Sequence, residues 1–356
     1  MVFNSTNKTN NSLILMNGDF DERFYLVIGS NWTYDSIYLF LISPWSFVNF
    51  WLNIISLFIL FRIKENSKSA KLYTYLKVYI ADCAFMSFLG SFIFCTYSPR
   101  YFSFALGFVG RVLRCQIYNS LTTFLYFYSN VLDIFITFER LSQLSLYSAS
   151  FFNRTPPLIL CLTGFFGCLI FNAPSFLWNF VQSDEEFYGK ARDLANLDKF
   201  SYCGKTDFIK SNLGGILTLL MIIVRDLITL ILEIIFDILS IYYYVNFMKK
   251  KRQISMSNNQ NHNQNNDHNS NNQNVHKLSW SDMNLFAMTI TLSTISLASH
   301  LMTASTTFFL TFFRTNYEST SLIFLICSTV NTTKYFSNFF ILYFFNRNFK
   351  NVLSKK

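Results

Sequence analysis

Charged residues are scarce in this chain, and their scarcity excludes an ordinary soluble protein. Asp, Glu, Lys and Arg make up 14% of its 356 residues, whereas 51% are hydrophobic and 43 are Phe. The apolar residues lie in long runs rather than in periodic stripes, and the run 36–61 has no charged residue. As a helix that run would be about 39 Å long, enough to cross a hydrocarbon layer of about 30 Å.

Recognisable enzyme motifs are also missing. The sequence contains no HExxH zinc motif, no GxSxG nucleophile motif and no phosphate-binding loop. We therefore predict that the chain is not an enzyme and that it carries no metal centre.

Seven apolar runs dominate the rest of the chain. They cover residues 36–61, 72–97, 115–138, 157–181, 213–247, 284–313 and 320–345. The runs exceed 20 residues and do not alternate in polarity, so they indicate helices rather than a membrane β-barrel. We predict an all-α membrane protein, a seven-transmembrane helix bundle over residues 36–346.

The distribution of Lys and Arg predicts the orientation of this bundle. With the N-terminus outside, Lys and Arg number 15 in the inner segments and 11 in the outer segments. Because basic residues favour the cytoplasmic side, we expect an external N-terminus and a cytoplasmic C-terminus in the plasma membrane. The net charge of +9 is then mostly cytoplasmic and suits an anionic lipid surface rather than nucleic acid.

The polar segments fit the same orientation. Residues 1–35 form a predicted extracellular tail with four glycosylation motifs, at Asn4, Asn7, Asn10 and Asn31. The Asn-rich third cytoplasmic loop, residues 249–280, is predicted to be disordered, and residues 347–356 form a short basic tail. No cleavable signal peptide is visible, so the first span is expected to direct membrane entry.

Two cysteines are predicted to lie on the oxidising side of the membrane. Cys115 lies 25 residues before Arg140, a helical separation of about 37 Å, so the two residues belong at opposite surfaces. Cys203 is the one cysteine in the long outer loop near 182–212. A Cys115–Cys203 disulfide would tie this loop to the third helix; the alternative is two unpaired thiols.

The order and spacing of several residues resemble those of rhodopsin-like (class A) G-protein-coupled receptors over about residues 36–350. The resemblance is carried by Asn53, Asp82, Cys115, Ser129, Glu139-Arg140-Leu141 and the Tyr343-to-Phe349 spacing. Spans five to seven lack proline, and the usual motifs of spans six and seven are replaced by "TISLASHLMTAST" and "SNFFILY". Such losses are typical of divergent invertebrate neuropeptide and chemosensory receptors.

The resemblance implies a receptor that activates heterotrimeric G proteins. It assigns a coupling switch to Glu139, Arg140 and Tyr343, a disulfide to Cys115, and a short amphipathic helix to the segment after span seven. It also implies an interior polar cluster of Asn53, Asp82 and Ser129 that holds sodium. A protonated Asp82 hydrogen-bonded to its neighbours is the alternative, and we expect no other cofactor.

The ligand is less constrained by the sequence. Thr122 stands where amine receptors carry an Asp, and Lys334 is one place away from the opsin lysine. A charged outer loop, 182–200, favours a peptide over a small odorant. The predicted pocket residues are Thr122, Arg225, Asp226, His300 and Lys334.

Two alternatives remain open. One is a chemosensory receptor for a small molecule. The other is an ion- or proton-coupled transporter, suggested by charges within the apolar runs, because such charges are costly in a membrane. These charges are Asp82, Asp133, Glu233, Asp237 and Lys334.

Overall fold

The computed structural model describes residues 41–63, 70–97, 108–144, 154–177, 179–181, 203–261, 280–312 and 317–354. The four glycosylation motifs of the tail 1–35 and residues 262–279 of the third cytoplasmic loop lie outside these ranges.

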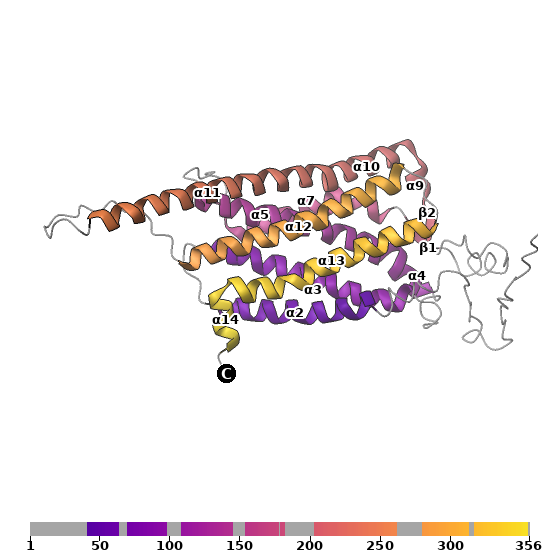
Figure 1. The fold of residues 1–356 in the computed structure, drawn as a ribbon. Coiled ribbons are helices and arrows are strands. Elements are labelled where there is room, and N and C mark those ends of the chain that lie inside the picture. The colour runs from indigo at the N-terminus through magenta and orange to yellow at the C-terminus, as the bar shows by residue number, and fades with distance from the viewer. Residues whose placement is uncertain are drawn as a thin grey trace, which may run out of the picture.

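Seven long helices form most of the described structure. They are α2 (Ser43–Arg62), α3 (Ala70–Tyr97), α5 (Asn119–Leu144), α7 (Pro157–Phe176), α11 (Thr229–Asn261), α12 (Trp280–Phe312) and α13 (Tyr317–Phe345). They run lengthwise alongside one another as a bundle (Figure 1). Each helix overlaps one of the apolar runs of the sequence. Such runs form helices in a membrane because a helix satisfies its backbone hydrogen bonds within its own segment.

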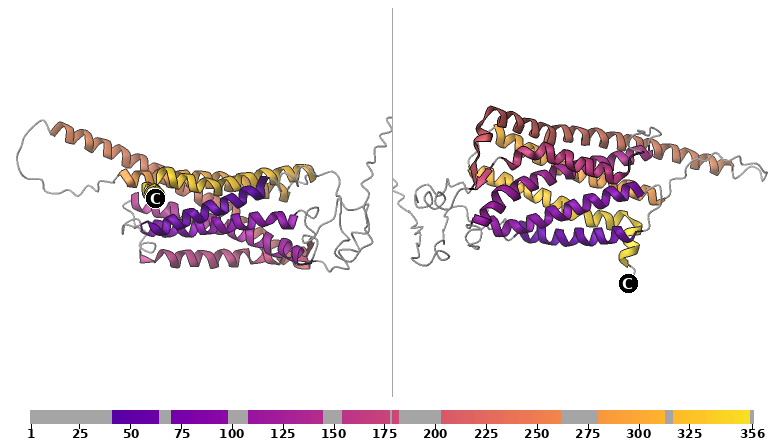
Figure 2. Two further views of the ribbon diagram at one scale, coloured as in Figure 1. Left: turned by 90° about the horizontal axis from the view of Figure 1, so that it is seen from below. Right: turned by 180° about the vertical axis from the view of Figure 1, so that it is seen from behind.

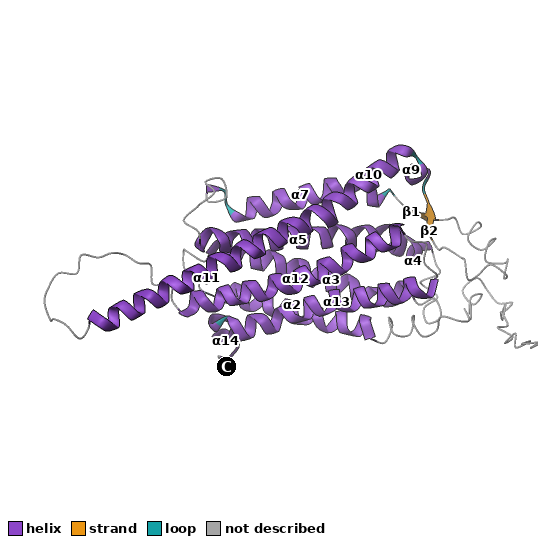
Figure 3. Cartoon of the chain, turned by 45° about the horizontal axis from the view of Figure 1, so that its top comes forward, coloured by secondary structure: helices purple, strands orange, loops and turns teal. Residues whose placement is uncertain are grey.

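Shorter elements complete the bundle. Helix α4 (Phe108–Val112) and the π-helix η3 (Leu113–Tyr118) lead into α5, while α9 (Asp207–Lys210), α10 (Asn212–Ile222) and the π-helix η5 (Ile223–Ile228) lead into α11. Strands β1 (Asn179–Val181) and β2 (Cys203–Lys205) pair antiparallel. They lie beside α4 and α9 at one end of the bundle, here called the strand end (Figure 3).

Among the residues that the structure describes, four helical segments are long and apolar enough to cross a membrane. They are Ser43–Arg62, Phe108–Gln143, Pro157–Phe176 and Phe286–Thr306. Large apolar side chains on them, such as Phe58, Phe166 and Ile170, point outward, as expected of a surface that contacts lipid. The described part of the chain is thus almost wholly helical and suited to a membrane. That α3, α11 and α13 also cross the membrane, and how the termini are oriented, stay predictions.

The C-terminal residues form the short helix predicted after span seven. Helix α14 (Arg347–Ser354) turns away from α13 at the end of the bundle opposite the strands, here called the α14 end (Figure 1). Phe349 is fully buried and packs edge-on against Phe339, with ring centroids 5.9 Å apart. Asn346 Nδ2 donates to the Tyr73 hydroxyl at 3.1 Å, so α14 is anchored by both an apolar and a polar contact.

The segment predicted as a disordered third cytoplasmic loop differs from its prediction. We expected disorder from residue 249, but α11 continues to Asn261 and projects beyond the other helices (Figure 2). Extending an existing helix avoids the cost of a new nucleus. The Lys249–Arg252 segment also consists of good helix formers, so the helix continues past the apolar run 213–247.

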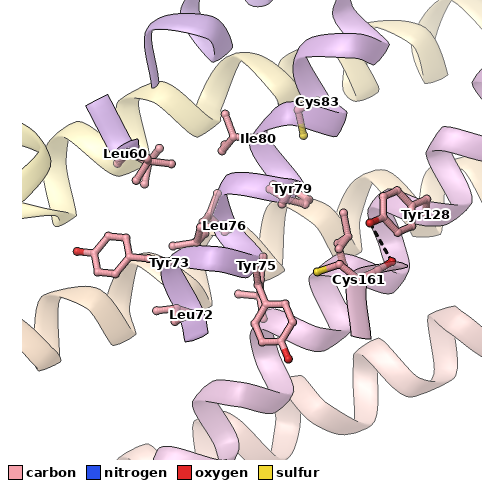
Figure 4. Close-up of a cluster of buried hydrophobic side chains, with 14 of the residues drawn as sticks. Leu60, Leu72, Tyr73, Tyr75, Leu76, Tyr79, Ile80, Cys83, Tyr128 and Cys161 are labelled. Atoms are coloured by element: carbon pink, nitrogen blue, oxygen red, sulfur yellow. Dashed lines mark hydrogen bonds between the residues drawn. The ribbon is translucent and has the colours of Figure 1, made fainter. Parts of the chain in front are cut away.

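An aromatic and aliphatic cluster joins α2, α3, α5 and α7. It includes Leu60, Leu76, Tyr79 and Cys83, which are all buried (Figure 4). The Tyr128 hydroxyl donates to the Cys161 carbonyl of α7 at 3.1 Å. This pairing satisfies a polar group within an otherwise apolar contact.

Gly90 allows α2 and α3 to approach closely. A Cβ at this position would lie 2.8 Å from Ser46 Oγ and 3.1 Å from Ser46 Cβ. We expect Gly90→Val to destabilise the bundle by about 1–3 kcal/mol, the usual cost of overpacking, and to lower the Tm of the purified protein. Gly167→Val is the matched control, because a Cβ there meets nothing within 4 Å. An equal loss of Tm in both variants would contradict the close approach.

Candidate functional site

Arg140 and Glu139 are joined through a third side chain at the α14 end. Arg140 is 5% exposed and Glu139 is 7% exposed. Arg140 NH1 donates to Gln143 Oε1 at 2.8 Å, and Gln143 Nε2 donates to Glu139 Oε1 at 3.1 Å. Sequence reasoning had missed Gln143, although side chains three and four positions apart on a helix are neighbours.

The same arginine connects two helices. Arg140 Nε donates to Thr289 Oγ1 of α12 at 3.1 Å. Arg140 also lines a largely apolar cavity of about 230 Å³ against α11 and α12. Tyr343, the third predicted switch residue, is partly buried near α14, where Lys350 Nζ lies 5.6 Å from its ring centroid.

Polar contacts continue from Arg140 towards the middle of the bundle. Thr137 and Ser293 have hydroxyl oxygens 3.3 Å apart. Ser293 Oγ in turn donates to Asp237 Oδ1 at 2.5 Å. These contacts link α5, α12 and α11, one helical turn deeper than Arg140.

A buried cluster of an acid and a histidine lies further along the bundle, beyond the Ser293–Asp237 contact. His300 Nδ1 and Glu233 Oε2 are 2.6 Å apart, and both side chains are almost completely buried. The Tyr126 ring of α5 packs edge-on against the His300 ring, with ring centroids 5.9 Å apart. His300 Nε2 lies 3.3 Å from Thr229 Oγ1, so the cluster joins α5, α11 and α12.

Arg225 and Asp226 form an ion pair within one turn of η5. Arg225 Nε and NH2 bind Asp226 Oδ1 and Oδ2 at 2.7 and 2.6 Å. Both residues are buried. Such a bidentate pair neutralises two charges that would be costly in a membrane interior.

No hydrogen bond joins the members of the predicted polar cluster, Asn53, Asp82 and Ser129, within the described residues. Asn53 Nδ2 donates to the Asn49 carbonyl at 2.8 Å and to the Tyr335 carbonyl at 3.2 Å. It therefore ties α2 to α13 rather than binding Asp82. Within the described part of the chain, the Asp82 carboxylate and the Ser129 hydroxyl have no hydrogen-bond partner.

Lys334 lies in the polar interior and not at the predicted ligand pocket. Its side chain is 1% exposed, and its Nζ lies 6.0 Å from the Tyr79 ring centroid. Within the described part of the chain its Nζ makes no hydrogen bond. The sequence marked Lys334 as a costly charge in an apolar run but did not show which groups surround it.

A second cavity of about 280 Å³ lies in the half of the bundle nearer the strand end. Its lining includes Thr122 and Arg225 of the predicted pocket, together with Tyr126 and Asn331. Most lining side chains carry hydroxyl or amide groups. Asp226, His300 and Lys334 are not part of this lining, so the structure gathers two of the five predicted pocket residues there.

Cys115 lies on η3, close to the two strands. It is fully buried and disulfide-bonded. Cys203 opens β2 opposite Val181 of β1, but its side chain lies outside the described set, so its pairing with Cys115 stays a prediction. Four cysteines within the described helices are free: Cys83, Cys161, Cys168 and Cys327.

Comparisons with known proteins leave the family open. No protein-family model matches this chain, and no curated protein matches it. A functional proposal therefore has to stand on the residues and contacts described above.

Proposed function

We propose that this chain is a rhodopsin-like (class A) receptor of the plasma membrane that activates heterotrimeric G proteins when an extracellular ligand binds. The observation that carries the proposal is the bond from Arg140 on α5 to Thr289 on α12. This bond lies at the α14 end, whereas the cavity lined by Thr122 and Arg225 lies towards the strand end. A ligand and a G protein would thus act on opposite halves of the same helices.

The contacts of Arg140 suit a two-state switch. Gln143 belongs to the same helix, so it would keep its bond to Arg140 whatever α12 does. Thr289 belongs to α12, and movement of α12 away from α5 would break its bond. A hydrogen bond to a charged group contributes about 1.5–3 kcal/mol. That is enough for a ligand with a modest preference between the two states to shift their populations.

The cavity near the strand end limits how the ligand binds. At about 280 Å³ it is slightly smaller than typical ligand pockets, which range from about 300 to 1,000 Å³. A peptide, the ligand class we propose, would place only one end or one side chain in it and rest the remainder on the outer loops. A small-molecule ligand of a chemosensory receptor would fill the cavity by itself.

The switch can be tested without knowing the ligand. Thr289→Val keeps the side-chain shape but removes the acceptor for Arg140, so we expect ligand-independent GDP–GTP exchange to rise several-fold. Exchange should be measured with a panel of purified G proteins at matched surface expression. Thr294→Val is the matched control on α12, because Thr294 is exposed and its hydroxyl donates to its own helix at the Ile290 carbonyl.

Two results would count against the receptor proposal. One is a basal exchange rate in Thr289→Val equal to that of the wild type with every G protein tested. The other is the same rise in Thr294→Val, which would trace the effect to α12 in general and not to the Arg140 contact.

An ion- or proton-coupled transporter is the second candidate. It is favoured by the contacts from Glu233 through His300 to Thr229 in the bundle interior, because groups in such a chain can pass a proton between them. The purified protein in liposomes should then carry a proton flux that Glu233→Gln abolishes. A receptor would show no flux and would keep G-protein activation in the same preparation.

A further inference from the structure

The cavity beside Arg140 contains polar groups that the proposed switch does not use. Its volume is about 230 Å³, and residues of α5, α11 and α12 line it. An apolar cavity of about 150 Å³ in a protein core can stay dry and bind benzene. The cavity beside Arg140 is therefore large enough for a small organic group, and its lining indicates the kind of group.

Asp237 and Ser240 bring unsatisfied hydrogen-bonding atoms to this lining. Ser240 is 3% exposed, and its Oγ makes no hydrogen bond to the residues that the structure describes. Asp237 Oδ1 accepts from Ser293 Oγ at 2.5 Å, whereas Asp237 Oδ2 is buried and has no partner among the described residues. Because residues three apart on a helix lie on one face, a single ligand group can reach both side chains. Buried polar atoms without a hydrogen bond are unfavourable, so they favour a ligand that bonds to them.

Isoleucines connect the cavity to the lipid-facing surface of the bundle. Ile234, Ile238 and Ile241 of α11 line the cavity, and all three are exposed on the outside of the bundle. Phe286, at the other end of the lining on α12, stacks on Tyr244 of α11 with ring centroids 4.2 Å apart. This stack lies between the cavity and the start of α12. The exposed isoleucines therefore mark the lipid side as the entry.

The charges in the lining select against a charged ligand. Arg140 on α5 and Asp237 on α11 both line the cavity. A carboxylate would be attracted by Arg140 and repelled by Asp237, and an ammonium group would meet the reverse. Either group would also lose its hydration on entering. A hydroxyl group avoids this loss of charge hydration, since it can donate to a carboxylate oxygen and accept from a serine hydroxyl at the same time.

We propose that the space between α5, α11 and α12 is a binding site for a neutral lipid alcohol, an amphiphile with one alkyl chain and a hydroxyl group. The hydroxyl donates to Asp237 Oδ2 and accepts from Ser240 Oγ. The alkyl chain packs against Ile234, Ile238 and Ile290 of the lining, and the ligand enters from the lipid. The site rests on the cavity and its lining and does not require the proposed receptor activity.

The probe for this site is an octanol that carries a photoreactive diazirine at the far end of its chain. The full chain is reconstituted into phospholipid vesicles, irradiated with the probe and mapped by peptide mass spectrometry. We expect adducts to concentrate on the lining segments 234–241 and 286–297, above the background on exposed side chains of α2 such as Phe58. Unlabelled octanol should remove this excess, whereas octanoate and octylamine at equal concentration in the membrane should remove much less.

Two variants test the recognition and the space separately. Ser240→Ala removes a hydroxyl that has no bond within the described structure, so the protein should fold, and the excess labelling should fall about fivefold. Ile290→Phe fills the cavity and should abolish the excess. Ile231→Phe is the matched control, because Ile231 is an exposed residue of α11 that does not line the cavity. Its labelling should equal that of the wild type.

Three results would overturn the proposal. Adducts spread evenly over the lipid-facing helices would show general partition into lipid and no site. Octanoate or octylamine that competes as well as octanol would show that the cavity does not select a neutral alcohol. Excess labelling of Ser240→Ala equal to that of the wild type would remove this hydroxyl from recognition, and this variant decides the matter if Ile290→Phe does not fold. The readout is labelling, so a failure here is distinct from a failure of G-protein activation.

Discussion

Arg140→Ala should abolish G-protein activation. Truncating a buried, hydrogen-bonded charge typically costs 2–5 kcal/mol, so we expect GDP–GTP exchange to fall by at least about 30-fold. The measurement is sharpest in the Thr289→Val background, where basal exchange is expected to be high and no ligand is needed. Alanine at position 140 should return that background to the level of membranes without receptor.

Folding has to be separated from coupling in this experiment. Arg140 is joined to Glu139 through Gln143, so its removal leaves a buried acid with fewer partners and lowers stability. Surface expression and Tm are therefore measured beside exchange. Arg154→Ala is the matched control, because Arg154 is an exposed arginine at the start of the next helical segment. Full exchange by Arg140→Ala with every G protein that the wild type engages would refute the receptor mechanism.

Cys115→Ala should sharply lower the amount of protein at the cell surface. Cys115 is disulfide-bonded and buried on η3, and removing a native disulfide commonly costs about 2–5 kcal/mol in small secreted domains. We expect Cys203→Ala to have the same effect and the double variant to be no worse than either single one, because both changes remove the same bond.

Cys168→Ala provides the comparison for a simple loss of a buried sulfur. Cys168 is a free thiol on α7 and is as buried as most of the core, so its removal should reduce expression much less. Peptide mapping of surface protein without reduction tests the pairing itself. Recovery of Cys115 linked to a cysteine other than Cys203, or of Cys203 as a free thiol, would show the predicted bridge to be wrong.

The positions of the helices could be predicted from the chain alone to within several residues. The run 157–181 corresponds to α7, which begins at Pro157, and the run 320–345 ends where α13 ends, at Phe345. The short helix after span seven was also expected. Runs of apolar residues are a local property, and they predict helices because in lipid the backbone must satisfy its own hydrogen bonds.

The end of α11 shows where this local reasoning is weak. A polar, Asn-rich composition predicts that a segment cannot fold alone. It does not predict whether the preceding helix continues into the segment, as α11 (Thr229–Asn261) does through residues 249–261. Continuation depends on the helix that precedes the segment and not on the composition of the segment.

Contacts between helices were much less predictable than the helices. Asp82, Asp133, Glu233 and Lys334 stood out as costly charges in apolar runs, and each is buried in the structure. Their types and approximate depth follow from the sequence. The sequence does not show that Glu233 contacts His300, or that Asn53 binds the backbone of α13 instead of Asp82.

The physical reason is the rotation of each helix about its axis. Neighbouring residues on a helix point about 100° apart, so a small error in rotation exchanges an interior position for a lipid-facing one. Composition and run length set which segments are helical, because those properties are read along one chain. The partners of Arg140, His300 and Lys334 are set by how seven helices pack together, since each rotation is fixed by side chains on its neighbours.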